Sequence, residues 1–481
     1  GSSDKLVVSG DVNIAGGTVK AIATDTIVGT RSYKIIEASS VTGQFDVLDT
    51  ALVHGVTSSG LDYDPDAVWL SLTAMAFNDP NICLTWNQQQ LGGALQDIAD
   101  DGGNDITDQL QDLTDFNDLR DAYDQLCGQI RPTIAPILLG ISRLVMGAAS
   151  DRIENGYIMP GFASGTRGMG IGGPVAGLDS GRSYTYSPRG AIFAAGNGTA
   201  VLSDRPWGIW AKGYGMFGDR QAEEGVWGYQ YNAYGISLGV DLKFDEAFVG
   251  GITVGFATAD VDYDSSFDRS NIDAKHIGIY WRYNPDPWYI SGLASVGKLS
   301  MGTDRYVDLT GEHLIGEFDG ISQSLYVETG SKWRQVNDWQ VNPLAGIQLS
   351  RVHLDSYTET GGASALSFGE QDYDSIKGSL GGRITRVITA STFGSPATLE
   401  LRARWIHEFG DVQSVVRTAF ATNPDVTFGV RDAKLPRDSA LLGTSLNMEV
   451  NQQLRLWLDY DVRLNPDEAV HQISVVGQYR W

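Results

Sequence analysis

The chain has 481 residues, a formal net charge of −24 and 58 glycines. The acidic balance argues against a nucleic-acid-binding protein, because a phosphate backbone requires a basic surface. Two cysteines are too few for a disulfide-rich scaffold, and no stretch has the ~18 uninterrupted apolar residues of a transmembrane helix. The first residues, GSSDK, do not form a basic-then-apolar leader, so we expect any secretory signal to be absent or already removed. A soluble helical enzyme is a poor fit to this composition.

Composition divides the chain into parts. Residues 1–82 are rich in Val, Thr and Gly and look strand-like, whereas the apolar side chains of residues 83–155 have helical spacing. Residues 156–205 contain glycine runs such as GTRGMGIGGP, which are typical of a flexible linker. Residues 206–481 alternate between apolar and polar side chains with a period of two, which is the period of a β-strand.

The alternation in residues 206–481 predicts strands with one apolar and one polar face. Between Leu454 and Leu464 the even positions are all Leu, Tyr or Val, while the odd positions are Arg, Asp or Trp. An apolar outer band around a polar lumen favours a transmembrane β-barrel, and a soluble sandwich is the alternative. Twelve antiparallel strands are predicted, at about 206–217, 229–243, 247–261, 271–283, 287–301, 320–335, 338–353, 371–388, 396–409, 438–450, 453–464 and 468–481.

The connections between these strands indicate which end faces out. The gaps after odd-numbered strands are mostly long, at 302–319, 354–370 and 410–437, whereas most gaps after even-numbered strands are tight. Long outer loops and short periplasmic turns are typical of bacterial barrels. The short turn at 465–467 departs from this rule. Aromatic rings favour the membrane–water interface, and the predicted periplasmic strand ends carry a candidate aromatic girdle of Trp207, Trp281, Trp288, Trp333 and Trp339.

Residues 133–155 predict a helix inside the barrel. Charged side chains such as Arg143 and Arg152 interrupt its apolar positions, so it does not fit in lipid. The 22 residues from 134 to 155 would span about 33 Å, close to the ~30 Å of a hydrocarbon core. A barrel lumen lined by charges of both signs would accommodate it. The expected pore-helix residues are Ile137, Ile141, Leu144, Ala148 and Arg152.

In this order and spacing, three motifs resemble the autotransporters of type V secretion. They are the C-terminal strand SVVGQYRW, the strand opener WGIWAKGYG at 207–215, and the helix ending SDRIEN before a linker and twelve strands. The resemblance implies that the helix threads the pore and links the barrel to a passenger outside the cell. It also implies that the barrel-assembly machinery reads the C-terminal strand, at Val475, Gly477, Tyr479 and Trp481.

Residues 1–82 resemble the C-terminal end of such a passenger. Segments such as KLVVSGDVNIAGGTV and SYKIIEASSVTGQFDVL look like the last turns of a parallel β-helix, which buries its apolar face only by stacking. A small separate β-domain is the alternative. The stretch is too short to indicate what a longer passenger would bind or cleave.

Residues 83–132 predict an acidic helical hairpin. Apolar side chains mark one helix from Leu84 to Ile98 and a second from Ile106 to Leu126. An antiparallel hairpin would bring Cys83 beside Cys127, and an exported protein meets an oxidising environment, so we expect a disulfide between them, with two free thiols as the alternative. The many aspartates of the hairpin are expected to form a solvated face.

Motifs for chemistry do not fit this architecture. The glycines of GYGMFG at 213–218 match a dinucleotide fingerprint in letters, but they lie within a predicted strand rather than before a helix. The six histidines lack metal-ligand spacing, so we expect no metal, cofactor or catalytic site. Some autotransporters cut their own linker helix between paired asparagines, and this pair is absent here. The sequence leaves open whether the helix is cleaved.

These observations predict a mainly β protein: a 12-stranded antiparallel transmembrane β-barrel with a pore-threading α-helix, preceded by a helical hairpin and a β-helical stub. The expected function is an outer-membrane translocator that exports and anchors its passenger, with residues 1–132 at the cell surface. The alternatives are a plugged porin with a periplasmic N-terminal part, or a surface adhesin. The expected partners are outer-membrane lipid and lipopolysaccharide, the barrel-assembly machinery and periplasmic chaperones; we expect a monomeric barrel and no nucleic acid.

Overall fold

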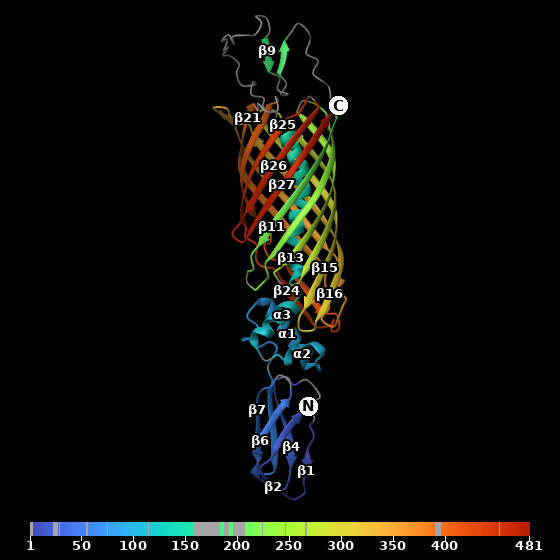
Figure 1. Cartoon of the computed structure of the whole chain (residues 1–481), viewed down its shortest axis with the longest axis vertical. Helices are drawn as coiled ribbons and strands as arrows, with labels where there is room; N and C mark the ends of the chain where they lie inside the picture. The colour runs from blue at the N-terminus through green and yellow to red at the C-terminus, as the bar shows by residue number, and fades with distance from the viewer. Residues whose placement is uncertain are drawn as a thin grey trace.

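The computed structural model describes residues 3–157 and 207–481 together with 183–186 and 192–195, except for short gaps at 23–26, 28, 54–55, 75, 114, 224, 246, 265–266, 390–395 and 452. Its parts follow one another along a single long axis (Figure 1). An N-terminal β unit is followed by a group of short helices, and these helices lie against one end of a barrel. The C-terminus lies at the opposite end of that barrel.

The N-terminal unit is a parallel coil of two turns. Strands β1 (Leu6–Val7), β2 (Asp11–Ala15) and β3 (Thr18–Ile22) pair in parallel with β4 (Thr30–Glu37), β5 (Ser40–Gln44) and β6 (Val47–Leu52), about 30 residues further along. This is the pairing of a parallel β-helix. The antiparallel hairpin of β7 (Val56–Asp64) and β8 (Ala67–Ala74) closes the coil by pairing with β4.

Three short helices follow where the sequence predicted a two-helix hairpin. They are α1 (Trp86–Asp100), α2 (Asp105–Gln111) and α3 (Phe116–Leu126). The second predicted helix is divided because its aspartates cap backbone N–H groups: the Asp115 carboxylate accepts from Asn117 N and starts α3. The hairpin prediction is therefore wrong in its helix count. We call residues 77–127 the helical unit.

The predicted disulfide between Cys83 and Cys127 is wrong, because both cysteines are buried free thiols. Each thiol donates to a nearby backbone carbonyl: Cys83 Sγ lies 3.3 Å from Phe77 O, and Cys127 Sγ lies 3.3 Å from Asp124 O. With three helices in place of a hairpin, each sulfur is directed to a local acceptor rather than to the other. Burial raises the pKa of the Cys83 thiol to about 11 and also raises the pKa of Cys127.

The described residues include twelve long strands that close into an antiparallel barrel. Each strand pairs with its sequence neighbour among the twelve, and the pairing of the first with the last closes the ring. The fold-class prediction is thus confirmed for the barrel. The strands are β11 (Trp207–Arg220), β12 (Tyr229–Lys243), β13 (Phe248–Tyr263), β14 (Arg269–Tyr283), β15 (Trp288–Val307), β16 (Glu312–Ser331), β18 (Trp339–Leu354), β21 (Gln371–Thr389), β22 (Pro396–Glu408), β25 (Asp438–Glu449), β26 (Leu454–Leu464) and β27 (Glu468–Arg480).

The long connections of the barrel are more ordered than the sequence suggested. Most of the expected loop 302–319 is strand, because β15 and β16 continue past the barrel rim to a tight turn. The other two long connections contribute β19 (Tyr357–Thr358), β20 (Leu366–Phe368), β23 (Val415–Phe420) and β24 (Thr427–Arg431), which form a four-stranded sheet over the barrel mouth. We call this the loop sheet. A short strand, β17 (Arg334–Val336), pairs with β18 at the opposite end.

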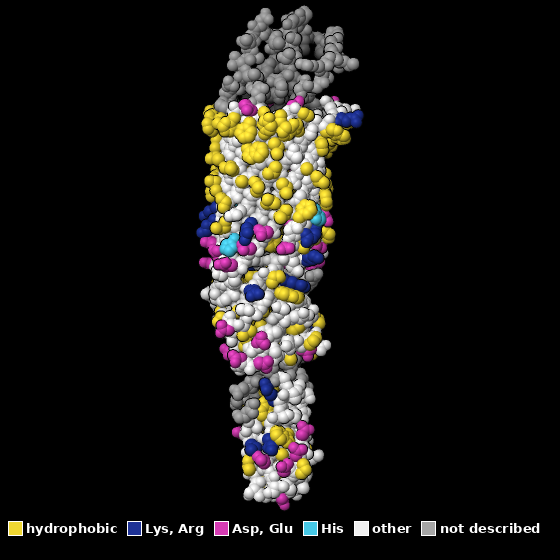
Figure 2. Space-filling view, turned by 180° about the vertical axis from the view of Figure 1, so that it is seen from behind, with side chains coloured by type: hydrophobic (Ala, Val, Ile, Leu, Met, Phe, Trp, Pro, Cys, Tyr) yellow, Lys and Arg dark blue, Asp and Glu magenta, His cyan; other side chains and the backbone are white. Residues whose placement is uncertain are grey.

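The outer surface of the barrel has two zones. Hydrophobic side chains cover the wall towards the C-terminal end, and charged side chains gather towards the end that bears the loop sheet (Figure 2). Trp207, Trp288 and Trp333 are exposed at strand ends on the apolar side, whereas Trp281 and Trp339 are half-buried there. The five tryptophans of the expected girdle therefore lie at one end of the barrel.

The segment expected to be a linker, 156–205, lies largely outside the described residues. Its described part contains β9 (Ser183–Tyr186), which pairs in antiparallel register with β10 (Ile192–Ala195).

Candidate functional site: the occupied lumen and its outer cap

The helix α4 (Ile130–Tyr157) lies inside the barrel, as predicted (Figure 1). By composition, its part from 130 to 149 is apolar enough to cross a membrane, but barrel strands surround it. Four of the five expected pore-helix residues, Ile137, Ile141, Leu144 and Ala148, are buried. Arg152 belongs to the helix, and its side chain lies outside the described residues. The 28 residues span about 42 Å, so the helix is longer than the hydrocarbon core.

One wall of the lumen is apolar and lies close to α4. Where they face the helix, strands β12 to β15 present small or aliphatic side chains, and these share one hydrophobic cluster with it. A close approach occurs at Gly255, where an added Cβ would overlap the Val145 side chain. A larger residue there would displace the helix, so the glycine in this strand serves packing. Members of this wall are Ala233, Ala257, Ala259, Ile272, Ala274, Leu293 and Leu299.

The rest of the lumen wall is charged, and Glu328 on β16 is the centre of its largest network. The Glu328 carboxylate is fully buried and accepts from the hydroxyls of Tyr289 and Tyr326, each at 2.6 Å. It also accepts from Arg383 at 3.1 Å and Arg404 at 2.6 Å. A charge in a site without bulk water must be paired and hydrogen-bonded, and here two cations and two hydroxyls compensate one carboxylate.

Further ion pairs extend this charged wall. Arg402 makes a bidentate contact with Asp461, at 2.8 and 2.7 Å, and lies 3.3 Å from Glu400. Arg480 lies 3.5 Å from Asp241, which also accepts from a tyrosine hydroxyl. The sequence predicted a lumen lined by charges of both signs, and these ion pairs agree with that prediction.

The helical unit packs on the loop sheet, and together they form an outer cap over the barrel mouth. The two share one hydrophobic core, in which Leu91, Leu95 and Leu126 from the helices meet Leu366 and Phe420 from the loops. The sequence predicted a solvated hairpin and missed this docking. The available signal was the presence of large apolar side chains in segments assigned to loops.

Side-chain amides attach this cap to backbone. Asn87 on α1 pairs with the edge strand β24, because its Nδ2 donates to Arg431 O and its Oδ1 accepts from Arg431 N, both at 3.0 Å. Gln129 makes the same kind of clamp, to Gly225 O and Trp227 N, each at 3.1 Å. These pairs satisfy backbone groups that would otherwise be unpaired at the mouth of the barrel.

A buried ion pair fixes the cap to the rim. The Arg305 guanidinium on β15 contacts both Glu359 oxygens, at 3.2 and 2.6 Å, and both side chains are almost fully buried. Arg305 also donates to Gln125 O in α3 at 2.6 Å, so one side chain joins the barrel, the loop sheet and the helical unit. Arg131, at the start of α4, donates to Asp355 O at 3.0 Å and stacks over the Phe318 ring.

Two carboxylates of the cap have raised pKa values. Burial raises the pKa of Asp124 in α3 to about 7, against the opposing effect of the hydrogen bond that it accepts from Gln88. Burial likewise raises the pKa of Asp432 to about 7, although Ser414 N donates to its carboxylate at 2.6 Å. Both carboxylates therefore take up protons at a higher pH than an ordinary aspartate, and the cap contains two charges that depend on pH.

The C-terminal strand β27 presents its expected assembly residues to the outside. The side chains of Val475, Tyr479 and Trp481 are exposed on the membrane face, and Gly477 has the same orientation between them. Strand β27 pairs on one side with β26 and on the other with β11, so it makes the closing seam of the barrel.

Comparison with known proteins gives consistent results. A family model described as the autotransporter beta-domain matches residues 209–461. The chain is 23% identical over 402 residues to an extracellular serine protease of Serratia marcescens, a match covering 82% of the chain and 34% of that protein. It is 26% identical over 190 residues to the adhesin BmaC autotransporter of Brucella suis, covering 37% of the chain and 5% of that protein. The chain thus spans about a third of the length of the Serratia relative.

Two solved structures are similar in architecture. The translocator domain of the autotransporter NalP from Neisseria meningitidis has a TM-score of 0.48 and 16% identity, covering 58% of this chain and 90% of that one. The beta domain of the Bordetella autotransporter BrkA has a TM-score of 0.44 and 17% identity, covering 57% of this chain and all of that one.

Proposed function

Because the chain belongs to the autotransporter beta-domain family, whose model matches more than half of it, we propose that the barrel delivers the residues before α4 to the cell surface and holds them there through α4. The barrel is an outer-membrane translocator. The observation that carries the proposal is the place of α4: it starts at the outer cap and passes through the lumen, and β11 starts at the other end of the barrel (Figure 1).

The orientation follows from the two ends of the barrel. The end with the long connections bears the loop sheet and the helical unit, and the end with short turns bears the exposed tryptophans. Long connections face outward in bacterial barrels, so residues 1–132 are outside the cell. A plugged porin with a periplasmic N-terminal part would need the opposite orientation, and is disfavoured for that reason.

For the passenger, we propose that the coil of β1 to β8 is the C-terminal end of a longer β-helix. Its parallel pairing and the partial coverage of the longer Serratia relative support this. Binding or cleavage of a target would then be a property of the whole passenger, and this chain would transport and anchor rather than catalyse. An adhesive role of residues 1–132 is the second candidate, and the similarity to an adhesin in Brucella suis supports it. Loss of adhesion on deleting 1–132 would favour it.

We also propose that the barrel-assembly machinery recognises the exposed side chains of β27, after periplasmic chaperones have carried the unfolded chain. Lipid and lipopolysaccharide would contact the apolar outer wall and the charged zone beside it. The closed ring of twelve strands is complete within one chain, which supports a monomeric barrel.

Surface labelling of intact cells tests the proposal. An epitope placed before Lys5 should be accessible to antibody on whole cells expressing the full chain. The matched control is a chain that begins at Trp207 and carries the same epitope, which should be accessible only after the outer membrane is broken. Equal labelling of both chains, or of neither, would contradict export through the occupied barrel.

A further inference from the structure

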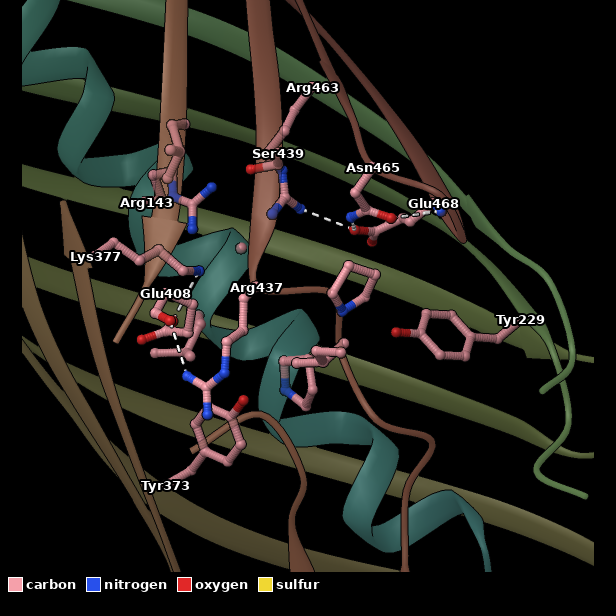
Figure 3. Close-up of a pocket in the computed structure, with 16 residues that line it drawn as sticks. Arg143, Tyr229, Tyr373, Lys377, Glu408, Arg437, Ser439, Arg463, Asn465 and Glu468 are labelled. Carbon is pink, nitrogen blue, oxygen red and sulfur yellow. Dashed lines mark hydrogen bonds and ion pairs between the residues drawn. The ribbon is translucent and has the colours of Figure 1, made fainter. Parts of the chain in front are cut away.

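A cavity of about 50 Å³ separates α4 from the charged wall of the barrel. It lies beside the first half of the helix, where β22 and β26 end and β27 begins, and Lys377 of β21 also lines it (Figure 3). Four cationic side chains and two carboxylates line it: Arg143, Lys377, Arg437, Arg463, Glu408 and Glu468. The lining therefore carries two more positive than negative formal charges.

Both carboxylates already have several donors. Glu408 accepts from Ser375 Oγ at 2.5 Å, from Ile376 N at 2.8 Å and from Gly410 N at 2.9 Å, and Lys377 Nζ lies 3.7 Å away. Glu468 accepts from Arg463 at 3.0 Å, and from Tyr231 and Asn465 at longer distances. Among the described residues, neither carboxylate makes a direct contact with Arg143.

Arg143 is the cation of this cavity that neither carboxylate contacts directly, although the charges of Glu408 and Glu468 act on it from a distance. It is the one charged side chain that α4 contributes to the cavity, and it makes no hydrogen bond or ion pair with any residue that the structure describes. Among its charged neighbours, Lys377 and Arg463 have the same sign, and Glu408 and Glu468 have the opposite sign. Arg437 is exposed to solvent and donates to two backbone carbonyls, Glu408 O and Gly410 O. A largely buried cation that no carboxylate contacts directly is unfavourable.

We propose that this cavity binds one small inorganic anion of halide size, held by Arg143 and flanked by Lys377 and Arg463. A volume of about 50 Å³ is several times what one water molecule needs, so it has room for a small anion together with water. Water would supply acceptors for the N–H groups, but it would leave the excess positive charge. The anion joins a cation of the helix to cations of the wall, so that it holds α4 in its final position.

Anomalous diffraction locates such an anion directly. Crystals of the full chain in detergent would be grown in sodium bromide, which is the probe. The expected result is a bromide peak within hydrogen-bond distance of the Arg143 guanidinium, absent in R143M. The matched control R351Q removes an exposed cation from the outer surface of the barrel and should keep the peak. A cavity that contains only water in the wild type would overturn the proposal.

A solution measurement separates binding from an effect on folding. The thermal unfolding midpoint of the wild type should be higher in bromide than in gluconate at equal ionic strength, by about 2–4 °C for a site contributing on the order of 1 kcal/mol. R351Q should keep this difference, and R143M and K377M should lose most of it while remaining folded on gels run without heating. A difference that persists in R143M and K377M would place the anion effect elsewhere and overturn the proposal.

Discussion

Replacing Glu328 by glutamine tests the claim that the charged wall is held by a few buried carboxylates. The substitution keeps the shape and one carbonyl oxygen, and it removes the negative charge that Arg383 and Arg404 share. Tyr289 and Tyr326 would then donate to a neutral amide at best. Both arginines are nearly fully enclosed by the barrel, so water does not replace the lost partner.

The expected loss in the free energy of unfolding is about 3–5 kcal/mol, the cost of removing one partner from a buried ion pair. Glu328 has two charge-assisted hydrogen bonds to arginine, which are worth about 1.5–3 kcal/mol each, so the two estimates agree. The matched control is Asp286→Asn in an exposed turn, where the partner Lys332 lies 3.1 Å away. Exposed pairs contribute about 0–1 kcal/mol, so this change should be small.

Urea unfolding of the barrel in detergent micelles, followed by tryptophan fluorescence, measures both losses. The double variant E328Q/R404Q should be more stable than the sum of the single losses predicts, because it removes both members of the pair together. Equal losses for E328Q and D286N, or strict additivity in the double variant, would refute the view that Glu328 organises this wall.

Three further predictions concern the cap and the C-terminal strand. Burial raises the pKa of Asp124 from 3.8 to about 7, so its contribution to the stability of the cap is full below pH 4 and is lost as the pH rises to 7. In urea unfolding of the cap, the wild type should lose about 1–2 kcal/mol between pH 5 and 8, and D124N should not show this loss. The same pH dependence in D124N would contradict the assignment. R305M leaves Glu359 buried without its cation, so the cap should loosen. Cells that express R305M should then admit a bulky antibiotic, and growth inhibition measures this. If these cells are as resistant as cells with the wild-type chain, the cap has no sealing role. Removing Trp481 should lower the fraction of folded barrel on unheated gels more than W333A does, and an equal effect would argue against a specific assembly signal.

The barrel could be predicted from the sequence because its physical cause is local. Each strand in contact with lipid must alternate apolar and polar side chains, so residues such as Leu454 to Leu464 reveal their own faces. The predicted bounds of β12 and β26 agree with the structure to within a residue. The pore helix was recognisable for a similar reason, since Arg143 in an apolar helix requires a polar neighbour.

The outer cap could not be predicted in the same way, because its contacts join distant segments. Asn87 pairs with Arg431, and Arg305 joins Gln125 to Glu359, yet none of these residues has a local pattern that indicates its partner. The cysteines illustrate the same limit. The expected antiparallel hairpin and an oxidising environment suggested a disulfide, but the third helix and the carbonyl acceptors of the thiols depend on the docked structure.

The central claim is that the chain passes through the barrel to the outside, and protease treatment of intact cells tests it most directly. One tag would be placed at residue 1 and a second in the 284–287 turn, which lies at the opposite end of the barrel. The account predicts that the N-terminal tag is lost while the turn tag survives until the outer membrane is broken. Survival of the N-terminal tag on intact cells would place residues 1–132 in the periplasm and contradict the translocator.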